Sequence, residues 1–245
     1  MIPVPSRKIG KISVGCGNCD GFLANRSRGP FGTEMNIMLE EGALPEQVDK
    51  VMVDFGYPMG PFAVADLAGL DIGLASRRRR AAENPNYRKM PIPDRIAELG
   101  RYGQKTGAGY YRYEKGDRTP YPDPVVTEII RSTAKELGVE QHEFTEEEIL
   151  TRLLFASVNE ACKIIEEGIA YRASDVDVMW LYGFGFPRHR GGLMYWADGI
   201  GVKVVYDQIA RWHQRFGERW KPANLLRHLA ETGTPFREAK PGKPR

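Results

Sequence analysis

Long apolar runs are missing from this chain of 245 residues. None approaches the roughly 18 to 20 consecutive apolar residues that a membrane-spanning helix needs. The first residues, Met-Ile-Pro-Val-Pro-Ser-Arg-Lys, also lack the apolar core of a signal peptide. With 42% hydrophobic and 27% charged residues, the composition is that of a globular domain. We therefore expect no membrane association and a cytoplasmic location.

Cysteine is scarce, and the net charge is small. Cys16, Cys19 and Cys162 are too few for a disulfide framework. Cys16 and Cys19 have the spacing of a redox pair or half of a zinc site, but neither a thioredoxin-like pattern nor a second ligand pair accompanies them. A structural or incidental role is therefore favoured over metal binding. The net charge of +3 gives no argument for a nucleic-acid partner.

Histidine is absent from the first half of the chain. His142, His189, His213 and His228 all lie in the second half. A histidine needs a carboxylate partner to act as a general base, and no short motif supplies one. Nucleophile-elbow and zinc-protease motifs are also absent. His189 lies in a Gly- and Pro-rich turn, where a structural role is favoured over an independent active site.

Helical patterns fill most of the chain. Apolar residues recur at helical spacing between Asn25 and Glu41, and Gly42 ends that segment. A second helix is predicted from Pro45, and a third begins over 62–70 and continues over 70–83. Asp94, Asp123, Thr145 and Ser174 are each placed to cap a later helix.

A second copy of the same pattern follows about 126 residues downstream. Phe184-Gly185-Phe186-Pro187 matches Phe55-Gly56-Tyr57-Pro58, and Ala197-Asp198 answers Ala65-Asp66. Asp175-Val176-Asp177 parallels the neighbourhood of Val48-Asp49. The order helix, glycine, short helix, Gly-aromatic-Pro turn and Asp-bearing helix is kept in both copies. The sequence therefore predicts an all-α protein of two duplicated helical domains, residues 8–117 and 119–237.

Two stretches have a functional and a structural interpretation. The glycines at 15, 17 and 21 are similar to a dinucleotide-binding turn, but the strand before them is too short and a helix follows where a parallel strand is required. Arg77-Arg78-Arg79-Arg80 is either a solvated helix end or a patch for the phosphates of a ligand such as coenzyme A. The structural interpretation is favoured for both.

Asn25 is the one candidate for substrate chemistry in the first half. It lies just inside a helix that glycines precede, where an amide could donate a hydrogen bond to a substrate carbonyl. Spacing alone favours a plain helix-start asparagine.

A family resemblance changes that balance. The segments Gly17–Arg26, Gly56–Phe62 and Gly103–Tyr113, together with Gly185–Arg188 and Arg190–Gly192, closely resemble the C-terminal helical domains of 3-hydroxyacyl-CoA dehydrogenases, and in particular the multifunctional β-oxidation enzymes. The resemblance runs from about Lys8 to about Phe236. It implies two all-α domains of the type also found at the C-terminus of 6-phosphogluconate dehydrogenase.

The resemblance also implies roles for individual residues. Asn25 matches the family's active-site asparagine, which helps bind and polarise the substrate while hydride passes to NAD. Met59, Pro61 and Phe62 match a loop that lines the acyl pocket. The second copy has Thr151-Arg152 in place of Asn25-Arg26, so no second active site is expected there.

The family's NAD-binding domain, catalytic serine and His–Glu pair do not occur in this chain. NAD is therefore implied by the family, with no binding site expected here. The resemblance predicts the substrate-closing, domain-packing helical part of a dehydrogenase, inactive alone, with acyl-CoA as substrate and a nucleotide-binding domain supplied in trans. The alternative is a non-catalytic assembly module derived from that enzyme, and a homo-oligomer is compatible with either hypothesis.

Overall fold

The computed structural model describes residue 6 and residues 8–241, and helices dominate this part of the chain, which confirms the all-α prediction. Contacts among the Cα atoms divide the chain into two compact units. One unit joins the chain before Thr33 to the chain after Leu150, and the other is Thr33–Leu150. The divisions fall within two long helices, α2 (Phe22–Glu40) and α8 (Glu146–Glu166). The predicted boundaries 8–117 and 119–237 follow the sequence repeat instead, and they stay a prediction.

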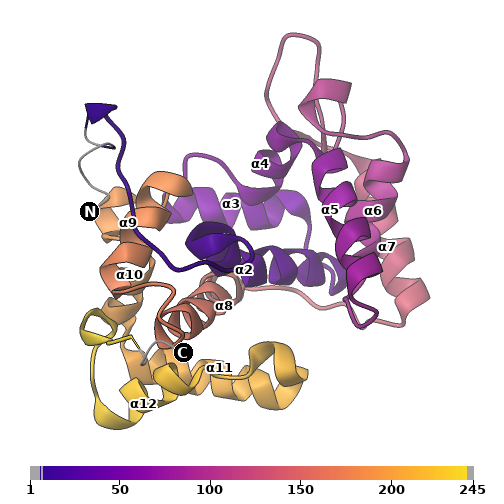
Figure 1. Cartoon of the computed structure of the whole chain (residues 1–245). Coiled ribbons are helices and arrows are strands. Elements are labelled where there is room, and N and C mark those ends of the chain that lie inside the picture. Colours follow the sequence, from indigo (N-terminus) through magenta and orange to yellow (C-terminus); the bar gives the residue numbers. More distant parts are fainter. Residues whose placement is uncertain (1–5, 7, 242–245) are drawn as a thin grey trace. The chain divides into compact units, whose positions relative to one another are not determined.

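The unit Thr33–Leu150 contains five helices and a short hairpin besides the parts of α2 and α8 that belong to it. Helices α5, α6 and α7 lie side by side in it, and a long loop separates α6 from α7 (Figure 1). The elements are α3 (Pro45–Phe55), α4 (Pro61–Ala68), α5 (Leu70–Glu83), α6 (Pro91–Glu98), the 3₁₀ turn η1 (Gln104–Thr106), the antiparallel strands β1 (Tyr111–Arg112) and β2 (Tyr121–Pro122), and α7 (Pro124–Leu137). Its fully buried side chains include Met38, Leu39, Val48, Phe62, Ile92 and Ile96.

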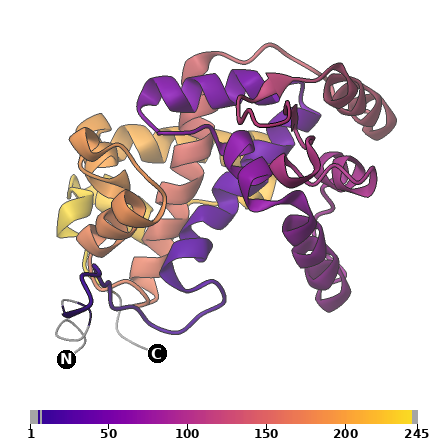
Figure 2. The same ribbon diagram turned by 90° about the horizontal axis from the view of Figure 1, so that it is seen from above.

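The other unit packs four helices with most of α8 and the start of α2. The segment before α2, residues 11–19, runs as an irregular chain (Figure 2). The elements after α8 are α9 (Ala173–Gly183), η2 (Arg188–Arg190), α10 (Leu193–Ile200), α11 (Val202–Phe216), η3 (Gly217–Trp220), α12 (Asn224–Thr232) and η4 (Phe236–Glu238). Its fully buried side chains include Leu153, Ile164, Trp180, Leu193, Ile209 and Phe236.

Local capping explains two of the helix starts as predicted. Asp123 accepts a hydrogen bond from the backbone N–H of Val125 at 3.0 Å, and Pro124 takes the first position of α7, where a missing N–H costs nothing. Thr145 accepts from the backbone N–H of Glu148 at 3.1 Å at the start of α8. Both side chains satisfy N–H groups that the helix itself leaves without a partner.

Two other capping predictions are wrong. Helix α6 begins at Pro91, three residues before Asp94, and the Asp94 carboxylate instead pairs with Arg77 at 2.6 Å. Helix α9 begins at Ala173, so the extended residue before it is Arg172 rather than Ser174. In α6, the fixed backbone angle of a proline starts the helix without a side-chain cap.

Candidate functional site

Asn25 lies in the first turn of α2, and its side chain is exposed. Its backbone N–H donates to the carbonyl of Gly21 at 3.0 Å. The side-chain amide makes no hydrogen bond to any other residue in the described part of the chain. An amide with both its donor and its acceptor open to solvent can bind a carbonyl or hydroxyl oxygen of a ligand.

The turn that leads into α2 is tight. Gly21 has φ 78° and Phe22 has φ 49°, which is a left-handed conformation that aromatic residues rarely adopt. The backbone N–H of Phe22 donates to the carbonyl of Cys19 at 3.0 Å, and the Cys19 thiol donates to the Phe22 carbonyl at 3.3 Å. These bonds hold the turn and therefore set where the first turn of α2 begins.

Arg26 anchors the same turn to α8. Its guanidinium donates two bonds of 2.7 Å to the Glu167 carboxylate and one of 3.0 Å to Glu160. The bonds to Glu167 contribute most to holding the pKa of Arg26 above its ordinary value, and those to Glu160 add to this against the cost of burial. A bidentate pair of this kind fixes orientation as well as contributing energy. The residue next to Asn25 is thus held rigidly.

The equivalent position of the second copy is built differently. Arg152 is fully buried, and its guanidinium lies 5.1 Å from the centre of the Phe216 ring. Thr151, in the place of Asn25, is half-buried and carries no amide. The absence of a second active site there stays a prediction.

The three residues matched to the acyl pocket lie in the Thr33–Leu150 unit, around the start of α4. Met59 is 36% exposed, whereas Pro61 and Phe62 are buried. The Phe62 ring is 0% exposed and meets the Tyr110 ring edge-to-face at 4.6 Å between centres. Of the three, only Met59 presents its side chain to solvent, so Phe62 is part of the core of its unit. The substrate-binding role of these residues stays a prediction.

Asp49 caps α4 from a distance in sequence. Its carboxylate accepts from the backbone N–H groups of Phe62 at 2.8 Å and Ala63 at 2.9 Å, and from the Tyr111 hydroxyl at 2.9 Å. Burial raises the pKa of Asp49 to about 6, since a charged carboxylate loses water there, although the three donors oppose this effect. Gly60 is required at the cap because a Cβ there would lie 2.3 Å from the Asp49 Cβ.

The second copy has the same kind of long-range helix cap. Asp177, on α9, accepts from the backbone N–H groups of Met194 at 2.7 Å and Tyr195 at 3.3 Å, at the start of α10. Burial raises its pKa to about 6 as well. Gly192 stands where Gly60 does, with a Cβ position 2.4 Å from the Asp177 Cβ. The same long-range cap in both copies supports the sequence repeat at the level of hydrogen bonds.

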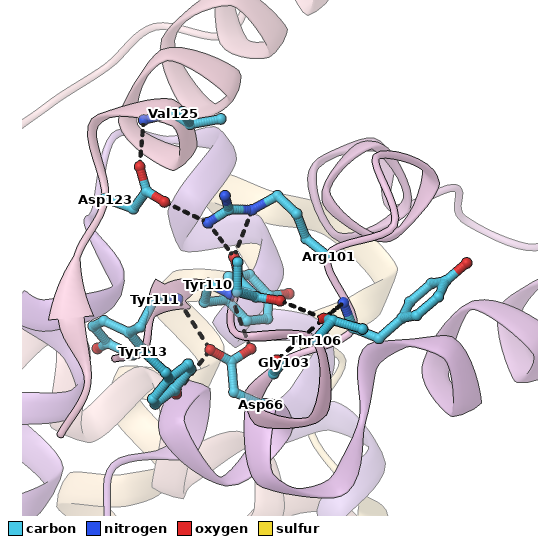
Figure 3. A network of polar contacts seen from close by, with 12 residues as sticks. Asp66, Arg101, Gly103, Thr106, Tyr110, Tyr111, Tyr113, Asp123 and Val125 are labelled. Atoms are coloured by element: carbon cyan, nitrogen blue, oxygen red, sulfur yellow. Dashed lines mark hydrogen bonds and ion pairs between the residues drawn. The ribbon is translucent and has the colours of Figure 1, made fainter. Parts of the chain in front are cut away.

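Asp66 organises the hairpin that follows α6. Figure 3 shows its carboxylate accepting from the backbone N–H groups of Tyr110 and Tyr111, at 2.9 and 3.0 Å, and from the Tyr113 hydroxyl at 2.9 Å. Burial raises the pKa of Asp66 against these bonds. Asp198 in the second copy accepts from the backbone N–H of Arg237 at 3.0 Å. Sequence reasoning placed Asp66 and Asp198 in register but missed this role.

In Figure 3 the same network continues to α7. Arg101 donates to the carbonyl of Gly109 at 2.9 Å and to Asp123 at 2.6 Å, so the residue that caps α7 also pairs with the hairpin. The opposite charge of Arg101 and the bond from Val125 hold the pKa of Asp123 below its ordinary value, against the effect of burial. The tyrosine-rich segment therefore packs on the helices, as predicted.

The arginine run at the end of α5 is largely neutralised. Arg77 pairs with Asp94, Arg78 with Glu98 and Arg79 with Glu83, at 2.6, 3.0 and 2.9 Å. These pairs support the solvated-helix interpretation over a phosphate patch.

Other candidate residues show no built site. His189 is exposed, and among the described residues no carboxylate pairs with it. The three cysteines are free thiols, and no group of histidine, cysteine and acidic residues in the described part of the chain could hold a metal ion. Of the helices that the structure describes, none is long and apolar enough to cross a bilayer.

Comparison with known proteins identifies the family. The model of the 3-hydroxyacyl-CoA dehydrogenase C-terminal domain matches residues 21–113 and 149–242. The peroxisomal bifunctional enzymes of Homo sapiens and Danio rerio are 40% and 38% identical over 245 and 244 residues, and each match covers 94% of this chain. The chain spans about a third, 34%, of the length of these relatives. A plant relative, from Arabidopsis thaliana, is a peroxisomal fatty acid beta-oxidation multifunctional protein, 35% identical over 246 residues that cover 96% of this chain and 33% of that protein.

Solved structures agree. The dehydrogenase part of multifunctional enzyme 1 from C. elegans superposes with a TM-score of 0.69 at 29% identity, over 91% of this chain and 50% of that one. The 3-hydroxybutyryl-CoA dehydrogenase of Escherichia coli shares the fold, with a TM-score of 0.70 at 20% identity, over 92% of this chain and 62% of that one. The relatives' names are peroxisomal, which does not support the predicted cytoplasmic location. The chain belongs to the 3-hydroxyacyl-CoA dehydrogenase family and corresponds to the C-terminal helical part of its β-oxidation enzymes.

Proposed function

We propose that this chain is the substrate-closing and domain-packing part of an NAD-dependent 3-hydroxyacyl-CoA dehydrogenase of fatty-acid β-oxidation. In this proposal Asn25 contacts the substrate, and Met59 contacts the acyl group. The observation that supports it is the exposed Asn25 amide, which has no hydrogen-bond partner in the described part of the chain. The turn that carries this amide is held in place by the bonds from Arg26 to Glu160 and Glu167. A rigid turn with an open amide is suited to orienting a substrate oxygen.

In this proposal the chemistry of hydride transfer comes from elsewhere. Another domain would hold NAD as the hydride acceptor and would carry the general base, while the residues of this chain bind and orient the substrate. The described strands β1 and β2 are antiparallel and two residues long, and the glycines at 15–21 follow no strand. These residues do not fit a dinucleotide cradle, so a nucleotide-binding domain would supply NAD and the base. The chain alone is then inactive.

Calorimetric titration of acetoacetyl-CoA into the purified chain tests the substrate half-site. We expect Asn25→Ala to weaken binding about tenfold, because a hydrogen bond to a polarised oxygen is worth roughly 1 to 1.5 kcal/mol. Asn25→Asp has the same shape but lacks the N–H donors, so it should bind at least as weakly. Asn86→Ala, an exposed asparagine in the loop after α5, is the matched control and should bind like the wild type. If the wild type does not bind, or Asn25→Ala binds equally well, the proposal is wrong.

A second candidate function is a non-catalytic assembly module. The observation in its favour is a group of exposed apolar side chains on α4 and α5, where Val64, Leu67 and Ile72 are 39%, 53% and 64% exposed. Apolar side chains gathered on neighbouring helices are typical of a surface that another protein covers. The partner tested here is a second copy of the chain. Sedimentation equilibrium should show association of the wild type and weaker association of Leu67→Glu. A monomer in both, at all concentrations, would refute self-assembly.

The cellular location of this chain would be that of the dehydrogenase to which it belongs. Because the relatives are named peroxisomal or glyoxysomal, we propose that the dehydrogenase works where β-oxidation takes place in its host. The predicted cytoplasmic location stays a prediction for a host without such organelles. Fractionation of host cells, with detection of this chain by antibody, distinguishes the two.

A further inference from the structure

A hollow of about 680 Å³ lies in the loop between α6 and α7, within the Thr33–Leu150 unit. It is lined by residues on both sides of the β1 strand, namely Gln104, Lys105 and Gly107 before it and residues 113–118 after it. Its volume is in the range of sites that hold small molecules. None of its lining residues belongs to the candidate substrate site around Asn25.

Two of its cations have no acidic partner. Lys115 and Arg118 are exposed, and neither pairs with a carboxylate in the part of the chain that the structure describes. The acids beside them are engaged. Asp117 accepts from the backbone and hydroxyl of Thr119, at 2.9 and 2.7 Å, and from the Tyr121 hydroxyl at 3.0 Å. All three donors are neutral, so Asp117 keeps its negative charge, and together with Lys115 and Arg118 it leaves the hollow a net positive charge of one.

Two other charged side chains of the lining have partners of opposite charge. Lys105 pairs with Asp71 at 2.6 Å, and Glu114 lies 3.8 Å from Arg112. The bonds from Thr119 hold the pKa of Asp117 below its ordinary value, so this carboxylate stays ionised and keeps its partners. Lys115 and Arg118 thus remain as the cations available to a ligand.

An aromatic wall completes the hollow. Tyr113 is half-buried, and its hydroxyl donates to Asp66 at 2.9 Å, as Figure 3 shows. That bond restrains the orientation of the ring. A ring held in one orientation beside unpaired cations is a platform for a planar base, because stacking loses less entropy when the ring is already ordered.

Two glycines keep the rim open. Gly116 has φ 86° in the turn that Asp117 closes by donating its backbone N–H to Glu114 at 3.0 Å. Gly107 has φ 75° on the opposite rim. Both conformations favour glycine, and a residue without a side chain at each point leaves the hollow accessible.

We propose that this hollow binds a nucleotide, with the base stacked on Tyr113 and the phosphates bound by Lys115 and Arg118. The ligand class follows from the pairing of an aromatic face with two unpaired cations in a hollow of small-molecule size. The hollow shares no lining residue with the proposed substrate-binding residues, so the proposal stands whether or not Asn25 binds acyl-CoA.

Calorimetric titration of adenosine diphosphate into the full chain tests this. Adenosine and inorganic pyrophosphate, titrated separately, measure how much the base and the phosphates each contribute to binding. We expect adenosine diphosphate to bind at submillimolar concentration, and both partial ligands to bind at least tenfold more weakly. Lys115→Gln/Arg118→Gln should weaken adenosine diphosphate binding about tenfold and abolish most of its salt dependence.

Matched variants separate the ring and the charge from general effects. Tyr113→Phe keeps the ring and should bind, whereas Tyr113→Leu should bind like pyrophosphate alone. Arg80→Gln removes an exposed cation of α5 outside the hollow and should leave binding unchanged. Circular dichroism and the melting temperature establish that each variant is folded. The proposal is overturned if the wild type shows no binding at millimolar nucleotide, or if Arg80→Gln weakens binding as much as the double variant.

Discussion

Phe62 offers the sharpest test of which residues at the start of α4 are structural. Its side chain is 0% exposed, and its ring meets Tyr110 edge-to-face at 4.6 Å. Replacing a fully buried phenylalanine by alanine costs about 3 to 5 kcal/mol through lost transfer energy and the cavity left behind. The aromatic pair contributes about 0.5 to 1.5 kcal/mol of this. We therefore expect Phe62→Ala to lower the free energy of unfolding by about 4 kcal/mol.

Urea unfolding followed by far-ultraviolet circular dichroism measures the change, with the m-value as a check on the unfolding model. Met59→Ala is the matched control, three residues away and 36% exposed, and it should cost less than about 1 kcal/mol. A double-mutant cycle of Phe62→Leu with Tyr110→Leu should give a coupling of about 1 kcal/mol. A loss below about 1.5 kcal/mol for Phe62→Ala, or an equal loss for Met59→Ala, would refute the assignment of Phe62 to the core.

Three further predictions follow from the caps and the anchor of α2. Because burial raises the folded-state pKa of Asp49 and Asp177 to about 6, both carboxyls bind a proton more tightly in the folded state. Their contribution to stability is therefore full below the unfolded pKa and is lost as pH rises through about 6. Urea unfolding between about pH 4 and 7 should show this slope, with a total loss of about 3 kcal/mol for each group concentrated below pH 6, and the Asp→Asn variants should not. Gly192→Ala places a Cβ 2.4 Å from Asp177 at φ 115° and should cost about 2 to 4 kcal/mol. Gly199→Ala, within α10, is the matched control: its Cβ would have no atom within 4 Å, and it should raise the free energy of unfolding by about 0.5 kcal/mol. Thermal melts that rank Gly192→Ala and Gly199→Ala alike would contradict this. Arg26→Met removes the ion pairs to Glu160 on α8 and to Glu167 just after it and should cost about 2 kcal/mol in the same melts, whereas no loss would mean that the anchor is dispensable.

Local sequence determined the helical content and several boundaries of this protein. Helix α5 ends at Glu83 as predicted, because an Asn-Pro segment follows it. The break at Gly69, which separates α4 from α5 in the structure, was not predicted. The caps at Asp123 and Thr145 follow from bonds that span only two or three residues. The duplication was also visible in the order of these signals.

Tertiary structure decided which residues are buried and what the buried acids do. Asp49 caps a helix that begins 12 residues later, and Asp66 accepts bonds from backbone groups 44 and 45 residues away. No local propensity describes such bonds, because the acceptor and donor meet only after the helices pack. For the same reason Phe62 could be matched to an acyl pocket by sequence and yet lie in the core. The sequence by itself determined the helices, the repeat and the family resemblance of Asn25. The structure alone decided that Asn25 is exposed and lies beside an anchored Arg26, because exposure and the bonds to Glu160 and Glu167 depend on residues that are distant along the chain.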